Sequence, residues 1–174
     1  MPSCAGEYHR GVDPRPVRDS EAALIRWMGI QEANSAGFVH GGTVMKMCDE
    51  AAGIAAVKHS RCRVVTAAID RMTFMHPVHI GQLLTCRARV NAAWRTSMEV
   101  GVRVEAENPR TGEVRHTSTA YLTMVAIDDD GEPIGVPPLA VESDDERRRQ
   151  REAELRRQNR LNEREQIRAG RTSG

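Results

Sequence analysis

Residues 42–59 constrain the fold of this chain more than any other segment. They contain strong helix formers and no proline, and the Gly41-Gly42 pair gives a flexible entry, so they predict an α-helix. The helix is unusual because so many of its positions are small: Ala51, Ala52, Gly53, Ala55 and Ala56. Small side chains bury little area, so other parts of the chain must approach the helix backbone closely on more than one side. A sheet wrapped around this one helix meets that requirement.

Five other stretches have the patterns of strands. Residues 22–30 precede the helix, and residues 63–75, 82–94, 97–108 and 114–128 follow it. The stretch 97–108 alternates apolar and polar residues, which predicts an antiparallel strand with one face in solvent. Short connections with turn residues make the last four strands antiparallel neighbours. The fold class expected is α+β, with an antiparallel sheet around one central helix.

The two ends of the chain differ from this middle part. Residues 1–19 carry three prolines among glycines and charges, so we expect a poorly ordered N-terminal arm before a domain at 20–138. Residues 139–174 are rich in Arg, Glu and Gln and contain a capping-box pattern at Ser143 and Glu146. They predict a charged helix or tail without a core-facing side. Leu155, Leu161 and Ile167 are six residues apart, a spacing that does not fit a coiled-coil seam.

The overall charge restricts the partners. A length of 174 residues suits one domain with an appendage, and a net charge of +1 gives no electrostatic argument for nucleic acid or a membrane surface. Residues 1–19 lack the apolar run of a secretion signal, and no later stretch is long and apolar enough to span a bilayer. A cytoplasmic location is therefore predicted.

The cysteines and histidines do not predict a metal site. Cys4, Cys48, Cys62 and Cys86 include no Cys-x-x-Cys pair, which favours reduced thiols over disulfides or zinc. His76 and His79 flank a proline and have no third ligand nearby in sequence. We expect neither a metal nor a disulfide.

The residues with chemical potential lie around the start of the predicted helix. Asn34, Gly37 and His40-Gly41-Gly42 are followed, after six intervening residues, by Asp49-Glu50. Glycines at a helix start leave backbone N–H groups unshielded, and the helix dipole favours negative charge there. A carboxylate inside an Ala- and Met-rich helix costs free energy to bury unless it has a partner or faces a cleft. Without the surrounding motif, Asp49 would be read as a surface acid.

This pattern resembles the signature of hot-dog acyl-CoA thioesterases, in the group of the brain-type acyl-CoA hydrolases and their bacterial relatives. The resemblance continues through Val64-Val65-Thr66, through Phe74 with Pro77 and Gly81, and through residues 95–100, so it covers residues 22–128. It implies the hot-dog fold and hydrolysis of fatty acyl-CoA to free acid and CoA. It also implies a homodimer that assembles further into a trimer of dimers. CoA is then part of the substrate, and no cofactor is expected.

The resemblance also implies roles for individual residues. Asp49 is the expected base or nucleophile, and Asn34 is expected to reach Asp49 of the neighbouring subunit. His40, Gly41 and Gly42 form the expected oxyanion corner, in which His40 shapes the loop. The remaining candidates fall into two groups: for CoA, Arg95, Thr96, Ser97, Arg61 and Arg63; for the acyl chain, Val39, Met45 and Phe74, which fit a core equally well.

Three other functions remain open. A hydroxyacyl-thioester dehydratase shares the fold but pairs a histidine with an acid across the cleft, which the Asp49 motif argues against. A non-catalytic acyl-CoA-sensing module would keep the pocket and lack the base. An interaction protein would act through the Arg-rich tail, with salt-dependent binding of nucleic acid as its test. A serine esterase is not expected.

Overall fold

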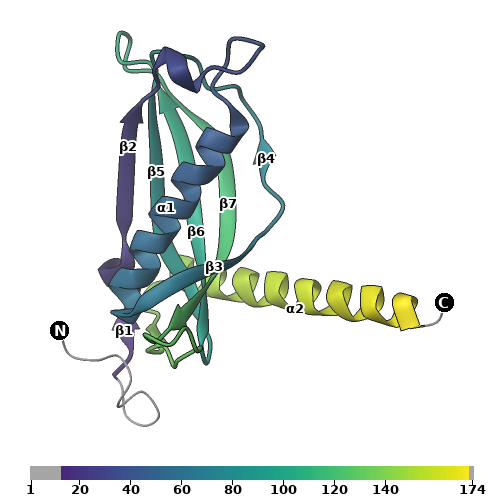
Figure 1. Ribbon diagram of the computed structural model, residues 1–174. Coiled ribbons are helices and arrows are strands. Elements are labelled where there is room, and N and C mark those ends of the chain that lie inside the picture. The colour runs from purple at the N-terminus through teal and green to yellow at the C-terminus, as the bar shows by residue number, and fades with distance from the viewer. Residues whose placement is uncertain (1–12, 173–174) are drawn as a thin grey trace.

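The computed structural model describes residues 13–172 and forms a curled antiparallel sheet around one helix (Figure 1). The main sheet has the strand order β2-β5-β6-β7-β3, and β4 pairs with β7 beside it. A small parallel pair joins β1 to β8. The helices are α1 at Gly41–Ser60 and α2 at Asp144–Thr172, with short 3-10 helices at Val17–Ser20 and Ile30–Glu32. The strands are β1 Arg15–Pro16, β2 Ala22–Trp27, β3 Arg63–Ile69, β4 Thr73–Phe74, β5 Leu83–Ala93, β6 Ser97–Glu107, β7 Val114–Ile127 and β8 Leu139–Ala140.

The predicted close approach to α1 is confirmed. Ala51, Ala52, Ala55 and Ala56 are each 0% exposed, because the inner faces of β5, β6 and β7 pack against this side of the helix. The core between them consists mainly of small and branched apolar side chains with a few methionines. Neither α1 nor α2, the two α-helices within residues 13–172, is both long and apolar enough to cross a membrane.

One predicted neighbour and two predicted boundaries differ from the structure. Strand β3 pairs with β7 and not with β5, the strand that follows it in the expected series. The single strand expected at 63–75 is divided at Asp70, whose backbone N–H donates to the carbonyl of Tyr121 at 2.9 Å. The described part of the expected N-terminal arm is joined to the domain, since Arg15 pairs with Leu139 and Val17 is buried at 3% exposed. Residues 1–12 of that arm lie outside the described residues.

The prediction that the C-terminal helix has no core-facing side is wrong for its first half. Helix α2 lies across the outer face of the sheet, where Ala153 is 0% exposed (Figure 1). Beneath it, Glu99 of β6 is also 0% exposed, and Arg156 binds its carboxylate through Nη2 at 2.7 Å and Nε at 3.1 Å. The guanidinium of Arg156 also lies 3.6 Å from the ring centre of Tyr121. The face of β6 expected in solvent is thus covered at Glu99.

A second ion pair holds α2 at the edge of the sheet. Arg160 donates to the carboxylate of Asp70 at 2.6 Å, directly after the edge strand β3. At the start of the helix, the predicted capping box is present: the N–H of Glu146 donates to Oγ of Ser143, and the Glu146 carboxylate accepts from the N–H of Ser143 at 3.0 Å. Helix α2 therefore spans the sheet from β5 to the end of β3.

Replacement of Arg156 by alanine should destabilise the protein by about 3 kcal/mol, because it leaves the buried Glu99 carboxylate with Arg160 as its remaining cation, at 3.9 Å and without a hydrogen bond. Urea unfolding followed by circular dichroism measures the change. Replacement of Arg151, which is exposed on the same helix, should change the unfolding free energy by less than about 0.5 kcal/mol. The double variant Glu99→Leu/Arg156→Leu should recover most of the loss. Equal small effects of Arg156→Ala and Arg151→Ala would show that the buried pair does not hold α2.

Candidate active site

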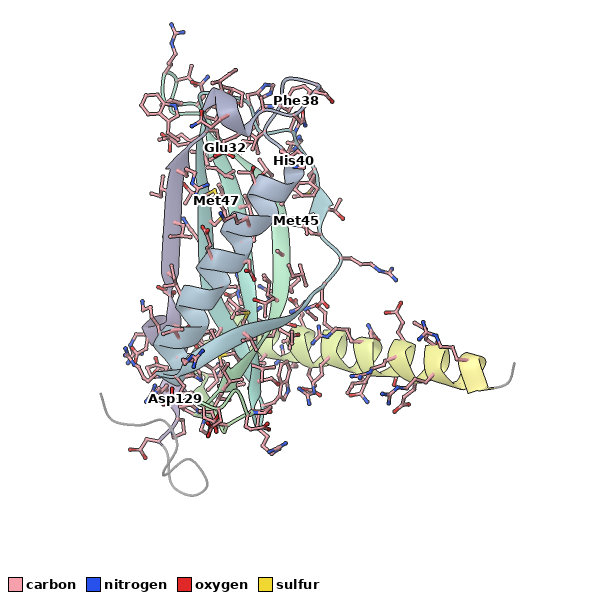
Figure 2. The ribbon with its side chains drawn as sticks, viewed as in Figure 1. Glu32, Phe38, His40, Met45, Met47 and Asp129 are labelled. Carbon is pink, nitrogen blue, oxygen red and sulfur yellow. The ribbon has the colours of Figure 1, made fainter. Side chains whose placement is uncertain are left out.

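The corner at the start of α1 is built by His40. Its Nδ1 accepts a hydrogen bond from the N–H of Gly42 at 2.9 Å, so His40 is the N-cap of the helix (Figure 2). The expectation that both glycines leave a free N–H is therefore wrong for Gly42. The N–H of Gly41 has no acceptor within residues 13–172. This N–H can therefore still donate a hydrogen bond, and it lies at the positive end of the helix dipole.

Asn34 fixes the loop that leads into this corner. Its Oδ1 accepts from the N–H groups of Ala36 at 2.9 Å and Phe38 at 3.1 Å, and its own N–H donates to the carbonyl of Phe38. Gly37 completes the turn with φ of 81°, a conformation that favours glycine. Within the described residues, Nδ2 of Asn34 has no hydrogen-bond partner. The amide can still donate to a substrate or to another subunit.

Asp49 has a partner on the edge strand. Oγ1 of Thr66, on β3, donates to Oδ1 of Asp49 at 2.5 Å. Gly41, Met45 and Asp49 are four residues apart along α1, so they share one helix face. The half-buried carboxylate therefore lies on the same face as the unused N–H, held by a hydroxyl.

Thr66 is a residue of this site that the sequence did not assign to it. It belongs to the Val64-Val65-Thr66 segment that carried part of the resemblance, but a threonine in a strand also fits an ordinary β-pattern. The signal that could identify it is its place in the family motif. Its chemical role follows only from the fold, which brings β3 beside α1.

The residues proposed for the acyl chain differ in exposure. Val39 is 6% exposed and belongs to the core, whereas Met45 is 39% and Phe74 is 46% exposed. A Cβ atom on Gly41 would lie 3.5 Å from Cζ of Phe74, so that ring lies against the start of the helix. Met45 and Phe74 are thus both at the surface beside the corner.

The residues proposed for CoA gather at the opposite end of the molecule. Ser97 and Arg63 pair with Val125 and Ile127 at the end of β7, and Arg61 is the C-cap of α1. Arg95 and Thr96 form the turn before Ser97. Since α1 has 20 residues and is about 30 Å long, this end is far from Asn34 and Gly41 in the same chain. One chain alone does not bring the two groups together.

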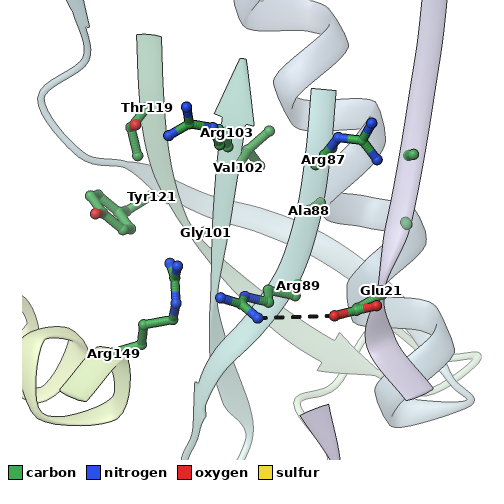
Figure 3. A pocket seen from close by; sticks show the side chains of 12 residues that line it. Glu21, Arg87, Ala88, Arg89, Gly101, Val102, Arg103, Thr119, Tyr121 and Arg149 are labelled. Carbon is green, nitrogen blue, oxygen red and sulfur yellow. Dashed lines mark ion pairs between the residues drawn. The ribbon is translucent and has the colours of Figure 1, made fainter. Parts of the chain in front are cut away.

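A hollow of about 550 Å³ lies on the outer face of the sheet, away from α1 (Figure 3). Arg87 and Arg103 are directly opposite each other there and share the carboxylate of Glu105, whose pKa is lowered by the hydrogen bond from Arg103. Arg89 pairs with Glu21 at 3.9 Å (Figure 3). Asp145 pairs with Arg89 and with Arg149, the fourth arginine of the hollow, so three acids neutralise most of the positive charge of four arginines. The hollow includes none of the predicted site residues.

Cys48, beside Asp49, is a core residue. Its thiol is 1% exposed, and a hydrogen bond with Cys86 and burial raise its pKa far above the ordinary value, which disfavours a nucleophilic thiolate. Cys48, Cys62 and Cys86 are free thiols, and Cys4 lies outside the described residues. Among residues 13–172, no group of three His, Cys, Asp or Glu side chains is placed to hold a metal ion.

A curled sheet around one helix, with the polar groups described above on that helix, defines the hot-dog class of fold. A family model described as "Thioesterase superfamily" matches residues 36–113. The chain is 40% identical to an uncharacterized acyl-CoA thioester hydrolase of Zymomonas mobilis, over 78% of this chain and 91% of that protein. The chain belongs to the thioesterase superfamily. It is also 34% identical to the cytosolic acyl coenzyme A thioester hydrolase of Rattus norvegicus, over 79% of this chain, but spans only 36% of that longer protein.

Solved structures agree with this membership. A hexameric acyl-CoA thioesterase in its apo form superposes with a TM-score of 0.84 at 36% identity, over 87% of this chain and 97% of that one. An acyl-CoA hydrolase of Staphylococcus aureus, solved with butyryl coenzyme A, gives 0.78 at 31% identity, over 89% and 97%. Variants of the Staphylococcus enzyme have also been solved in which an asparagine, an aspartate or a threonine is replaced by alanine.

Replacement of His40 by alanine should cost about 1 kcal/mol of stability, because the helix loses its N-cap. Replacement by asparagine, a good N-cap, should restore most of that loss. Thermal and urea unfolding measure the difference. If the histidine ring serves only as this cap, His40→Asn should retain the activity of the wild type. Loss of activity in a fully stable His40→Asn protein would contradict that role.

Proposed function

We propose that this protein is an acyl-CoA thioesterase that hydrolyses fatty acyl-CoA to free acid and CoA. The observation that carries the proposal is the position of the Asp49 carboxylate. Thr66 donates a hydrogen bond to it, and it lies on the same face of α1 as Gly41, whose N–H is unused. Membership of the thioesterase superfamily supports it, as do the acyl-CoA thioester hydrolases among its relatives. CoA belongs to the substrate, and the mechanism calls for no cofactor.

The proposed reaction divides the work among three groups. Asp49 takes a proton from a water molecule as the water oxygen bonds to the thioester carbon, or its carboxylate attacks that carbon first and forms an acyl anhydride that water hydrolyses after CoA has left. The N–H of Gly41 and the positive end of the α1 dipole stabilise the negative charge that develops on the carbonyl oxygen. The C–S bond then breaks, and CoA leaves as a thiolate that takes up a proton. The hydrogen bond from Thr66 fixes the orientation of the Asp49 carboxylate.

The unpaired edge of the sheet supports the expected homodimer. Strand β3 ends the order β2-β5-β6-β7-β3, so its outer edge has no neighbouring strand within the described residues. An exposed edge strand is a template for a second copy. Exposed apolar side chains surround this edge on β3, on α1 and around β4: Met45, Ile54, Val57, Val65, Ile69, Phe74 and Met75. Antiparallel pairing of β3 with β3 of a second copy would cover them.

Such a dimer brings together the two groups of proposed site residues that lie far apart in one chain. A two-fold axis through β3 reverses the partner, so the end that carries Arg61, Arg63 and residues 95–97 of one copy comes toward the Asn34 and Gly41 end of the other. The Nδ2 group of Asn34 is then available to the Asp49 region of the partner. Two equivalent sites form, each from both chains. A trimer of these dimers and a cytoplasmic location remain predictions.

The Staphylococcus variants support the choice of residues. That enzyme was solved with an asparagine, an aspartate and a threonine individually replaced, and these are the residue types of Asn34, Asp49 and Thr66. In this chain the last two are hydrogen-bonded to each other. The proposal therefore assigns Asp49 to the chemistry, and Asn34 and Thr66 to its support.

Replacement of Asp49 by asparagine should lower kcat at least about 100-fold, because the carboxylate base is lost while the shape is kept. Hydrolysis of an acyl-CoA series from short to long chains, with the released thiol detected by a chromogenic reagent, measures it. Thr66→Ser should retain activity and Thr66→Val should lose most of it. The neighbouring Glu50→Gln serves as the control and should keep kcat. If the folded wild type hydrolyses no member of the series, the enzyme proposal fails and the acyl-CoA-sensing module takes its place.

Co-expression of an Asn34→Ala chain with an Asp49→Ala chain tests the shared site. Random pairing makes half of the dimers mixed, and each mixed dimer has one intact site of two, so the mixture should regain about a quarter of wild-type activity. Each variant alone should be nearly inactive. Differently tagged chains allow the mixed dimer to be purified and assayed directly. A purified mixed dimer as inactive as its parents would show that both residues act within one chain.

A further inference from the structure

The side of α2 that faces its own sheet continues beyond that sheet. Arg149, Ala153, Arg156, Arg160 and Glu163 follow one another at intervals of four or three residues, which places them on one helix face. Ala153 is buried, Arg156 binds Glu99, Arg160 binds Asp70, and Glu163 pairs with Arg71 at 3.7 Å. The next position of the series is Ile167. It is five full turns from Arg149 and therefore points to the same side.

Ile167 lies past the edge of the sheet. Arg160 contacts Asp70, which directly follows the edge strand β3, and α2 continues for twelve residues beyond Arg160, about 18 Å. Figure 1 shows this part of the helix projecting away from the body. Every residue from 161 to 171 is exposed, and Ile167 is 51% exposed. Nothing in the described part of the chain covers the continued face.

We propose that the projecting end of α2 docks on the outer sheet face of a second copy of this chain. The inference rests on the β3-paired dimer proposed above. Strands are spaced by about 4.8 Å, and Ile167 lies about 10 Å along the helix from Arg160. That distance corresponds to two strand spacings. It places Ile167 above β7 of the partner, the strand next to the paired edge.

The antiparallel pairing of the two β3 strands determines which part of β7 in the partner Ile167 contacts. In an antiparallel pair centred on the middle of β3, the Asp70 end of one strand meets the Arg63 end of the other. Val65 pairs with Val125, and Arg63 pairs with Ile127, within each chain. Met124 and Ala126 belong to the core, so Val125 and Ile127 face the outer side. Ile167 therefore meets an outer-face patch formed by the partner subunit's Val65, the partner subunit's Val125 and the partner subunit's Ile127.

The charges beside this patch complement the helix end. The turn after β7 carries four acidic side chains within five residues: Asp128, Asp129, Asp130 and Glu132. The projecting part of α2 carries three arginines against two glutamates: Arg164, Arg168 and Arg171 against Glu163 and Glu165. Opposite charges on a polar rim around an apolar contact favour this register over a reversed one.

Disulfide trapping between two differently tagged chains tests the contact. One chain carries Ile167→Cys and the other carries Ile127→Cys, and both carry Cys4→Ser; the remaining native thiols are buried. Oxidation with diamide, which takes two electrons and two protons from the thiol pair, should link the two chains. Leu155→Cys is the control, because Leu155 is 63% exposed, lies about 120° around α2 from Ile167, and should give no link. Equal linking by both cysteines would overturn the proposed contact.

A second measurement does not depend on trapping. Ile167→Glu should raise the dissociation constant of the dimer about 100-fold, because the contact occurs twice in a two-fold dimer and each lost aliphatic anchor costs about tenfold, whereas Leu155→Glu should leave it unchanged. Sedimentation velocity over a dilution series measures both, and circular dichroism checks that the helix persists. A wild type that sediments as a monomer at every concentration would overturn the paired edge and, with it, this contact. A stable wild-type dimer in which Ile167→Glu behaves like Leu155→Glu would overturn this contact alone.

Discussion

The rest of the structure depends on the close packing of the sheet against α1. Alanines at positions 51, 52, 55 and 56 let the inner strands approach the helix backbone, and a larger side chain at any of them would push strands away. This approach brings the edge strand β3 beside the same helix. The 2.5 Å hydrogen bond between Thr66 and Asp49 exists only because of that position. Packing in the core thus sets the geometry of the site.

Two carboxylates on opposite sides of the sheet show how differently the fold uses the same group. Asp49 lies on the inner side, is half-buried, and is held by a neutral hydroxyl, which leaves its charge available for chemistry. Glu99 lies on the outer side, is fully buried, and is bound by a guanidinium, which commits its charge to holding α2. In the proposed reaction, the partner of each group, and not its residue type, decides whether the group acts on a substrate or on the structure.

Much of this architecture could be predicted from local patterns. The helix at 41–60 and the strand segments follow from composition, alternation and turn residues, and the observed bounds differ by a few residues. The pairing of β3 with β7, in place of its successor β5, does not follow from these patterns. The docking of α2 could not be predicted in this way. Its sheet-facing positions are mostly arginines, which pattern reasoning assigns to solvent, and Arg156 and Arg160 are partly buried only because Glu99 and Asp70 meet them from distant parts of the chain.

The candidate site shows the same division between local and distant contacts. Asn34 and Asp49 could be assigned to the candidate site from the motif, and Gly41 from the predicted helix start, without knowledge of the fold. The hydrogen bond that removes the Gly42 N–H from use depends on the rotamer of His40, which no spacing rule specifies. The pairing of Thr66 with Asp49 joins residues 17 positions apart on different elements. Contacts of this kind are properties of the assembled sheet.

The exposed edge of β3 also affects how the chain behaves before it finds a partner. A newly folded monomer presents unpaired backbone groups next to Val65, Ile54 and Val57, and such an edge can pair with any other available strand. Pairing with a second copy would remove that hazard at the same step that completes the site. Selection for a soluble chain and selection for an active one then act on the same strand. This strand should therefore tolerate fewer changes than its exposure in a single chain suggests.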